Sequence, residues 1–132
     1  MAPTTLDQEP TLSDKHEIEA VVQTYFDAMY ESSVDKVHEA FHPAAMITGY
    51  SHGKLEQMSL EQFASFVARQ QPSAKDKGDP AVIEIVSLEI DGDIAVARVR
   101  DLYLGLTFLD ILSLLRVDGH WCIYNKLFHV EP

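Results

Sequence analysis

Apolar residues in the first part of the chain recur at the period of an amphipathic helix. From Asp14 onward they form one stripe with a spacing of three or four residues. Its members are Ile18, Val21, Val22, Tyr25, Phe26 and Met29. Asp14 and Glu17 have the spacing of a capping box, so we expect this helix to begin at Asp14.

Two shorter helices are predicted further along the chain, with a short strand at residues 45–50 between them. The second helix follows Ser33 and ends at Pro43, because a proline ring disfavours the helical conformation of the preceding residue. Ser59 and Gln62 form a further capping box, which predicts a third helix that ends before Pro72.

Strands dominate the rest of the chain, after a polar segment at residues 75–80. The apolar runs cover residues 82–90, 94–104, 106–117 and 120–130. Asp91-Gly92-Asp93 and Asp118-Gly119 indicate hairpin turns, because glycine tolerates the positive φ that such turns need. Helices followed by a meander predict an α+β fold with the helices on one face of an antiparallel sheet. We expect a flexible tail at residues 1–13 and a single domain at residues 14–132.

Length and composition fit one globular domain and exclude several functions. The chain has 132 residues, of which 46% are hydrophobic and 23% charged. Its net charge of -11 argues against nucleic-acid binding, which needs clustered Lys and Arg. No apolar run approaches the roughly 18 residues of a membrane helix. Residues 1–12 lack the pattern of a secretory signal, so we expect a cytoplasmic protein. The single cysteine, Cys122, is expected to be a buried and inert thiol.

Several short segments resemble the nuclear transport factor 2-like superfamily, from about Asp14 to His129. They are Val21-Val22-Gln23-Thr24-Tyr25, Ala40-Phe41-His42-Pro43, Gly119-His120-Trp121-Cys122-Ile123 and Asn125-Lys126. Within that superfamily the chain looks most like the putative lumazine-binding branch, with SnoaL-like proteins close by. The resemblance implies a cone-shaped, cystatin-like sheet wrapped on three N-terminal helices, with one apolar pocket and a homodimer through the outer sheet face. It implies no particular reaction, because the scaffold carries isomerases, cyclases, dehydratases and non-catalytic binders.

The last hairpin determines which side chains face the pocket. A two-residue turn at Asp118-Gly119, continued without interruption, pairs Asp110 with Leu127. One face then carries Phe108, Asp110, Leu112, Asn125, Leu127 and His129. Lys126 falls on the opposite face, where a dimer contact or solvent is expected, and a slip of one residue would exchange the two faces. Asp110 interrupts an apolar run, so its carboxyl group must be protonated or hydrogen-bonded.

Ketosteroid isomerase, a member of this superfamily, suggests roles for two of these residues. By resemblance, Tyr25 and Asp110 correspond to the two donors that stabilise the enolate oxygen in that enzyme. The general-base aspartate would fall on Gly49, which cannot move a proton. His42, His52 or His129 could replace it, and we take His129 with Asp110 and Tyr25 as the catalytic candidates. The alternative is structural: Tyr25 as a core aromatic, and Asp110 as a strand anchor paired with His129 or Asn125.

The expected ligand is a small, largely apolar and cyclic molecule. We expect contacts to it from Met29, His42, Tyr50, Phe63, Phe108, Leu112, Asn125 and Trp121. The primary hypothesis is a small-molecule-binding protein without a cofactor. The alternative is an isomerase, cyclase or dehydratase that uses the Asp110–Tyr25 pair. A third hypothesis is an interaction module whose pocket is filled by its own side chains.

His38-Glu39-Ala40-Phe41-His42 matches the H-E-x-x-H pattern of zinc metalloproteases. That pattern needs two histidines one turn apart on a helix, with a glutamate that activates zinc-bound water. Glu61 lies at a plausible distance for a third ligand. The predicted helix is too short for this motif, and Pro43 ends it, so we expect no metal here.

Overall fold

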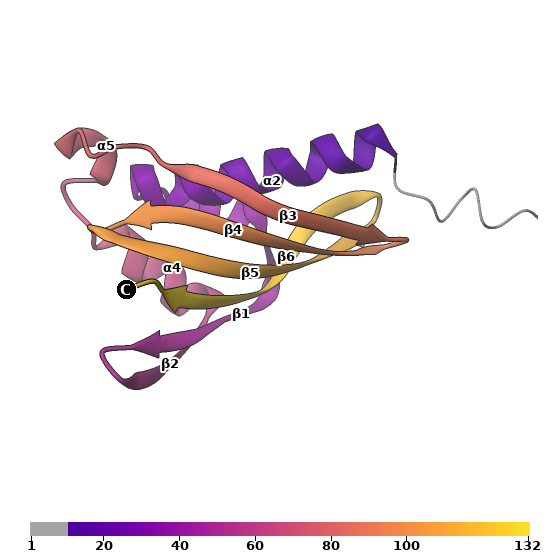
Figure 1. Ribbon diagram of the computed structural model, residues 1–132. Helices are drawn as coiled ribbons and strands as arrows, with labels where there is room; N and C mark the ends of the chain where they lie inside the picture. The colour runs from indigo at the N-terminus through magenta and orange to yellow at the C-terminus, as the bar shows by residue number, and fades with distance from the viewer. Residues whose placement is uncertain (1–10) are drawn as a thin grey trace, which may run out of the picture.

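The computed structural model of the chain describes residues 11–132, in which helices pack against one mixed sheet (Figure 1). The helices are α2 (Leu12–Glu31), α3 (Val34–Ala40), α4 (Leu60–Ala68) and α5 (Ala74–Lys77). The strands are β1 (Phe41–Ser51), β2 (Lys54–Ser59), β3 (Ile83–Asp91), β4 (Ile94–Tyr103), β5 (Leu106–Val117) and β6 (His120–Val130). Most of the predicted tail, residues 1–10, lies outside the described residues. No helix within residues 11–132 is long and apolar enough to cross a membrane.

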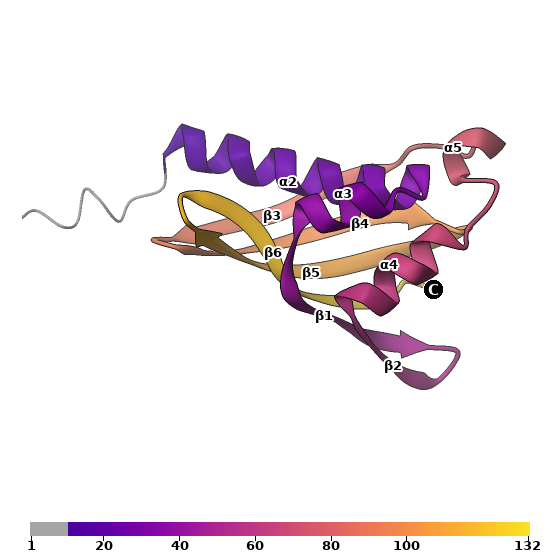
Figure 2. The same ribbon diagram turned by 180° about the vertical axis from the view of Figure 1, so that it is seen from behind.

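The six strands follow the order β2-β1-β6-β5-β4-β3. The predicted meander is present as β3 to β6, with antiparallel pairing throughout. The sheet as a whole is mixed rather than antiparallel, because β1 runs parallel to β6 and forms an antiparallel hairpin with β2 on its other side. Helices α2, α3 and α4 cover one face of the sheet and leave the other bare (Figure 2). The α+β fold is therefore confirmed, with this correction to the strand directions.

Helix α2 begins earlier than predicted, and Asp14 and Glu17 do not form the predicted capping box. Thr11 is the N-cap residue, and its hydroxyl accepts a hydrogen bond from the Asp14 N–H. The Asp14 carboxylate instead accepts from Trp121 Nε1 at 3.1 Å and from Arg116 at 2.7 Å. Glu17 accepts from the Trp121 N–H at 3.1 Å. The predicted capping box was wrong because these carboxylates fasten α2 to the hairpin of β5 and β6.

Other local predictions had mixed outcomes. The capping box at Ser59 and Gln62 is confirmed at the start of α4, with both reciprocal hydrogen bonds formed. The second helix ends at Ala40, earlier than Pro43, because Phe41 is already extended. Two elements were not predicted: β2, and the single-turn helix α5 within the polar segment. Both consist mainly of polar residues, which carry little periodic signal.

Gly49 shows why the sheet leaves no room for an aspartate at that position. Gly49 pairs with Phe128 in the parallel β1–β6 ladder. A Cβ atom on Gly49 would lie 2.4 Å from the Phe128 carbonyl oxygen and 2.6 Å from its ring. Real Cβ atoms do not approach backbone this closely, so a side chain here would displace the strand or the ring.

We therefore predict that Gly49→Ala lowers the free energy of unfolding by about 1–3 kcal/mol through overpacking. Urea denaturation followed by circular dichroism measures this change. Thr48→Ala, one residue earlier on the same strand, is the matched control and should cost less than about 1 kcal/mol. A Gly49→Ala variant as stable as the parent protein would show that β1 and β6 are not packed as described.

Candidate functional site

A bulge in the last hairpin reverses the predicted faces. Val117 pairs with His120, as expected from the turn, but the register shifts between Ser113 and Leu114. Ser113 pairs with Asn125 and Leu114 with Ile123, so Tyr124 is an extra residue on β6. Beyond this point Asp110 lies opposite Phe128, and Leu112 lies opposite Lys126. The prediction was wrong because one inserted residue moves every later side chain of β6 to the other face.

A cavity of about 520 Å³ lies between the inner face of the sheet and helices α2 and α4. Its walls are mainly apolar and aromatic, with Met29, Met58, Phe63, Phe66, Phe108 and Phe128 among them. Three buried polar side chains also line it, Asp101, Tyr103 and Lys126. His52, Glu56 and Arg69 lie at its exposed end. Of the predicted ligand contacts, Met29, Phe63 and Phe108 belong to this lining.

Tyr25 and Asp110 meet beside this cavity. The Tyr25 hydroxyl donates to Asp110 Oδ2 at 2.6 Å, and both side chains are 0% exposed. Tyr25 belongs to the buried stripe of α2, and Asp110 is an inward-facing residue of β5. Burial, reinforced by the Asp110 charge, raises the pKa of Tyr25 well above its usual range. The tyrosine is therefore a permanent hydrogen-bond donor to this carboxyl group.

A second buried carboxyl group, Asp101, lies on the neighbouring strand β4 and is 1% exposed. Asp101 pairs with Phe108, which makes Asp110 its diagonal neighbour. Burial, and after it the neighbouring Asp110, raise the pKa of Asp101 to about 9, although Lys126 acts in the opposite direction. Asp101 is therefore a neutral acid near pH 7.

Several buried polar atoms of this cluster lack a protein partner. Within residues 11–132, the Tyr103 hydroxyl, both Asp101 oxygens and Asp110 Oδ1 have no hydrogen-bond partner. The Asp101 carboxyl group and the Tyr103 hydroxyl therefore have hydrogen-bonding capacity that the described residues do not use. Burial raises the pKa of Tyr103, so this hydroxyl also stays a donor.

Asp101 and Lys126 were missed by sequence reasoning. For Asp101 a signal existed, because Ala97, Val99, Asp101 and Tyr103 alternate with two arginines and a partly exposed leucine and share one face of β4. For Lys126 the signal was hidden by the bulge at Tyr124. A buried carboxyl group and a buried amine in one cavity are functional candidates, since such groups are costly without a partner.

The remaining predicted site residues lie away from this cavity. His129 and Asn125 are exposed on the outer face of the sheet, so neither joins Asp110. Trp121 packs against the start of α2, where its Nε1 atom donates a hydrogen bond to Asp14. Tyr50 is 66% exposed. Leu112 is a fully buried core residue of β5.

The H-E-x-x-H segment does not have the geometry that its pattern requires. His38 lies on α3 and pairs with Glu61 at 2.9 Å on the exposed surface. His42 lies on β1, where its Nδ1 atom accepts from the Ala44 N–H, and it does not line the cavity. The two histidines therefore occupy different elements. Within residues 11–132, no group of three or more His, Cys, Asp or Glu side chains is arranged to hold a metal ion.

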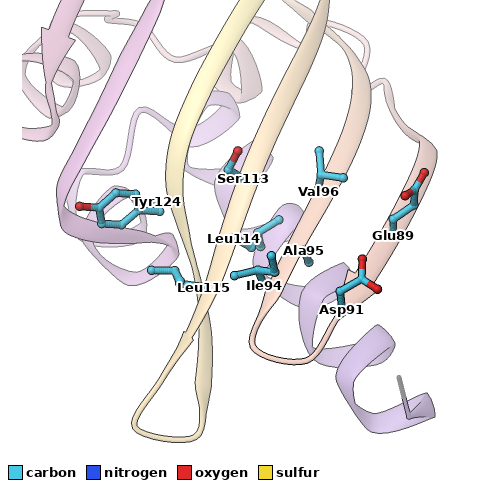
Figure 3. Close-up of a pocket in the computed structure, with 9 residues that line it drawn as sticks. All are labelled: Glu89, Asp91, Ile94, Ala95, Val96, Ser113, Leu114, Leu115 and Tyr124. Carbon is cyan, nitrogen blue, oxygen red and sulfur yellow. The ribbon is translucent and has the colours of Figure 1, made fainter. Parts of the chain in front are cut away.

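A second hollow, of about 370 Å³, lies on the bare face of the sheet (Figure 3). Ile94, Val96, Ser113, Leu115 and Tyr124 project side by side from β4, β5 and β6, and the carboxylates of Glu89 and Asp91 lie at one side. The buried acids lie on the opposite face of the sheet, so this hollow is separate from the candidate site. The homodimer expected at the outer face stays a prediction.

Comparison with known proteins agrees with this architecture. Residues 13–129 match the model of a family described as putative lumazine-binding. A curated relative, aldolase FrzH from Cladobotryum sp, is 28% identical over 119 residues, which cover 88% of this chain and 93% of the relative. A nuclear transport factor 2-like structure of unknown function from Methylobacillus flagellatus KT has 28% identity and a TM-score of 0.82, covering 94% of this chain and 97% of that one. A second, from Shewanella baltica OS155, has 25% identity and a TM-score of 0.81, covering 94% and 99%.

The raised pKa of Asp101 predicts a pH-dependent stability. In the unfolded chain Asp101 ionises near pH 3.8, and in the folded protein it ionises near pH 9. Between these values the folded state binds one more proton, so stability falls as pH rises, by up to about 1.4 kcal/mol per pH unit. Asp101→Asn removes this contribution. The free energy of unfolding, measured with urea, should fall between pH 5 and pH 8 in both proteins. The fall should be smaller in Asp101→Asn than in the parent protein by roughly 2–4 kcal/mol.

The exposed Asp91 provides the matched control, because Asp91→Asn should leave the pH dependence of the parent protein unchanged. Parallel stability profiles for the parent and Asp101→Asn would contradict a neutral Asp101 in the folded state.

Proposed function

The chain belongs to the putative lumazine-binding family of nuclear transport factor 2-like proteins, and we propose that its buried cavity binds a small, largely apolar, cyclic molecule through a carbonyl group. The observation that carries this proposal is the neutral Asp101 carboxyl group beside the free Tyr103 hydroxyl at an otherwise apolar cavity wall. The family description supports a small cyclic ligand.

The walls of the cavity suit an apolar ring. Its volume of about 520 Å³ lies in the range of small-molecule sites, roughly 300–1,000 Å³. Phe108 and Phe128 meet edge to face with ring centroids 6.1 Å apart, and the Phe63 ring packs against Phe41 at 5.7 Å. Such rings offer large apolar surfaces with few degrees of freedom to lose on binding.

The polar cluster suits an acceptor atom on that ring. Tyr103 and protonated Asp101 each present an O–H group in a site of low polarity, where a hydrogen bond is stronger than in water. A carbonyl oxygen has two lone pairs and can accept both hydrogens.

A second candidate function, enolisation of the bound carbonyl compound, is favoured by the same neutral acid. Donors aimed at a carbonyl oxygen stabilise the enolate that forms when the adjacent carbon loses a proton. The curated relative named aldolase FrzH supports carbonyl chemistry on this scaffold. His129, the base expected from the sequence, is not in the cavity; His52 is the histidine that lines it within the described residues.

Binding can be tested with a matched pair of ligands, the ketone 2-tetralone and the hydrocarbon tetralin. We predict that Tyr103→Phe weakens the affinity for the ketone about fivefold, since one hydrogen bond to the carbonyl is worth about 1 kcal/mol. The affinity for the hydrocarbon should be unchanged. Isothermal titration calorimetry measures both, and Tyr50→Phe is the control because Tyr50 lies outside the cavity. Equal losses for both ligands, or no binding of either, would refute the carbonyl contact.

Enolisation can be tested by the exchange of the α-hydrogens of 2-tetralone for deuterium, followed by proton NMR in D2O. We predict that the protein accelerates this exchange and that Asp101→Asn lowers the acceleration about 100-fold. Asp91→Asn, on the outer face, should retain the full rate. Binding without accelerated exchange would leave the protein as a binder and exclude the enzymatic function.

A further inference from the structure

Lys126 is a buried lysine whose amine forms no salt bridge within residues 11–132. It is 6% exposed, whereas the other five lysines, Lys15, Lys36, Lys54, Lys75 and Lys77, are all exposed or partly exposed. Lysine is among the residues least often buried, because removing its charge from water is costly. Its position on the inner face of β6 depends on the bulge at Tyr124.

Aromatic rings lie around the amine. Nζ lies 4.7 Å from the ring centroid of Tyr25, 4.9 Å from that of Phe63 and 5.9 Å from that of Phe128. Its one hydrogen bond within residues 11–132 reaches the Met29 sulfur at 3.9 Å, a weak acceptor. No carboxylate of the described residues forms an ion pair with it; the salt bridges of the other lysines are on the surface.

We propose that Lys126 is the nucleophile of the cavity and forms an imine with the carbonyl carbon of the bound ligand. This proposal rests on the proposed function, because it requires a carbonyl compound in the cavity. Lys126, Asp101 and Tyr103 line the same cavity, so a carbonyl compound held by the two donors shares that cavity with the amine. Lysine amines serve as nucleophiles that form imines with carbonyl compounds in enzyme sites.

The chemical step balances without a cofactor. The Lys126 ammonium gives one proton to the aspartate pair, and the free amine attacks the carbonyl carbon. A C–N bond forms, the electron pair of the C=O bond moves to the oxygen, and Asp101 protonates that oxygen. The nitrogen loses a proton to the pair, the hydroxyl group takes a proton and leaves as water, and the nitrogen lone pair completes a C=N bond. Ammonium and carbonyl compound thus yield iminium and one water.

The aromatic rings around Nζ also stabilise the product of this step. An iminium ion carries the same positive charge as the ammonium it replaces, so its interactions with the ring faces persist. The iminium acidifies the carbon next to it, and loss of that proton gives an enamine. An enamine is a carbon nucleophile, so this residue would extend the chemistry of the cavity from enolisation to carbon–carbon bond formation.

Reductive trapping tests this proposal directly. The parent protein is incubated with 2-tetralone and sodium cyanoborohydride at neutral pH, and the modified lysine is identified by peptide mass spectrometry. We expect one reduced adduct, at Lys126, formed at least about tenfold faster than any adduct at the exposed Lys54. Lys126→Arg keeps the positive charge but cannot form an imine, and should abolish this adduct. Lys54→Arg is the matched control and should leave it unchanged.

Binding of 2-tetralone, measured by calorimetry on the same protein, separates the possible failures. Binding without an adduct at Lys126 would overturn the imine and leave the proposed function intact. Neither binding nor adduct would overturn both. Equal modification of all lysines would also refute the proposal, because it would show that the cavity confers no reactivity. Trapping on the parent protein does not depend on whether any Lys126 variant folds.

Discussion

The hydrogen bond from Tyr25 to Asp110 joins the first helix to the inner face of the sheet, at a point where neither group reaches solvent. A carboxyl group so placed is costly unless it is hydrogen-bonded. The tyrosine satisfies one oxygen of Asp110, and the neighbouring Asp101 retains its proton. The cavity therefore combines apolar walls with a polar cluster in which the Asp101 carboxyl group is uncharged. Each property proposed for the site depends on this arrangement.

A single inserted residue decides what else enters the cavity. The bulge at Tyr124 turns Lys126 inward and places His129 on the outer face. Without it, His129 rather than Lys126 would face inward. Bulges often redirect a side chain next to a functional site, and they are hard to foresee because the strand pattern continues on both sides. Gly49 keeps a side chain out of the site, because β1 contacts Phe128 too closely at this position. The resemblance to ketosteroid isomerase would place the general-base aspartate there.

The sequence was sufficient for the elements with strong periodicity. The helix that carries Tyr25, the capping box at Ser59 and the turn at Asp118-Gly119 were all predicted correctly. The resemblance to ketosteroid isomerase placed Tyr25 and Asp110 in one site, and in the structure the two side chains are hydrogen-bonded. Pairings between distant parts of the chain could not be predicted from the sequence. Examples are the parallel pairing of β1 with β6 and the hydrogen bond between Asp14 and Trp121. Local patterns carry no information on such pairs.

One of the two buried aspartates, Asp101, is uncharged in the folded protein at neutral pH, and the proposed site depends on this state. The most direct test is an NMR titration of the side-chain carboxyl carbon of Asp101, assigned by comparison with Asp101→Asn. We predict the chemical shift of a protonated carboxyl group at pH 7 and a transition near pH 9. A transition close to pH 4, as for an exposed aspartate, would contradict it.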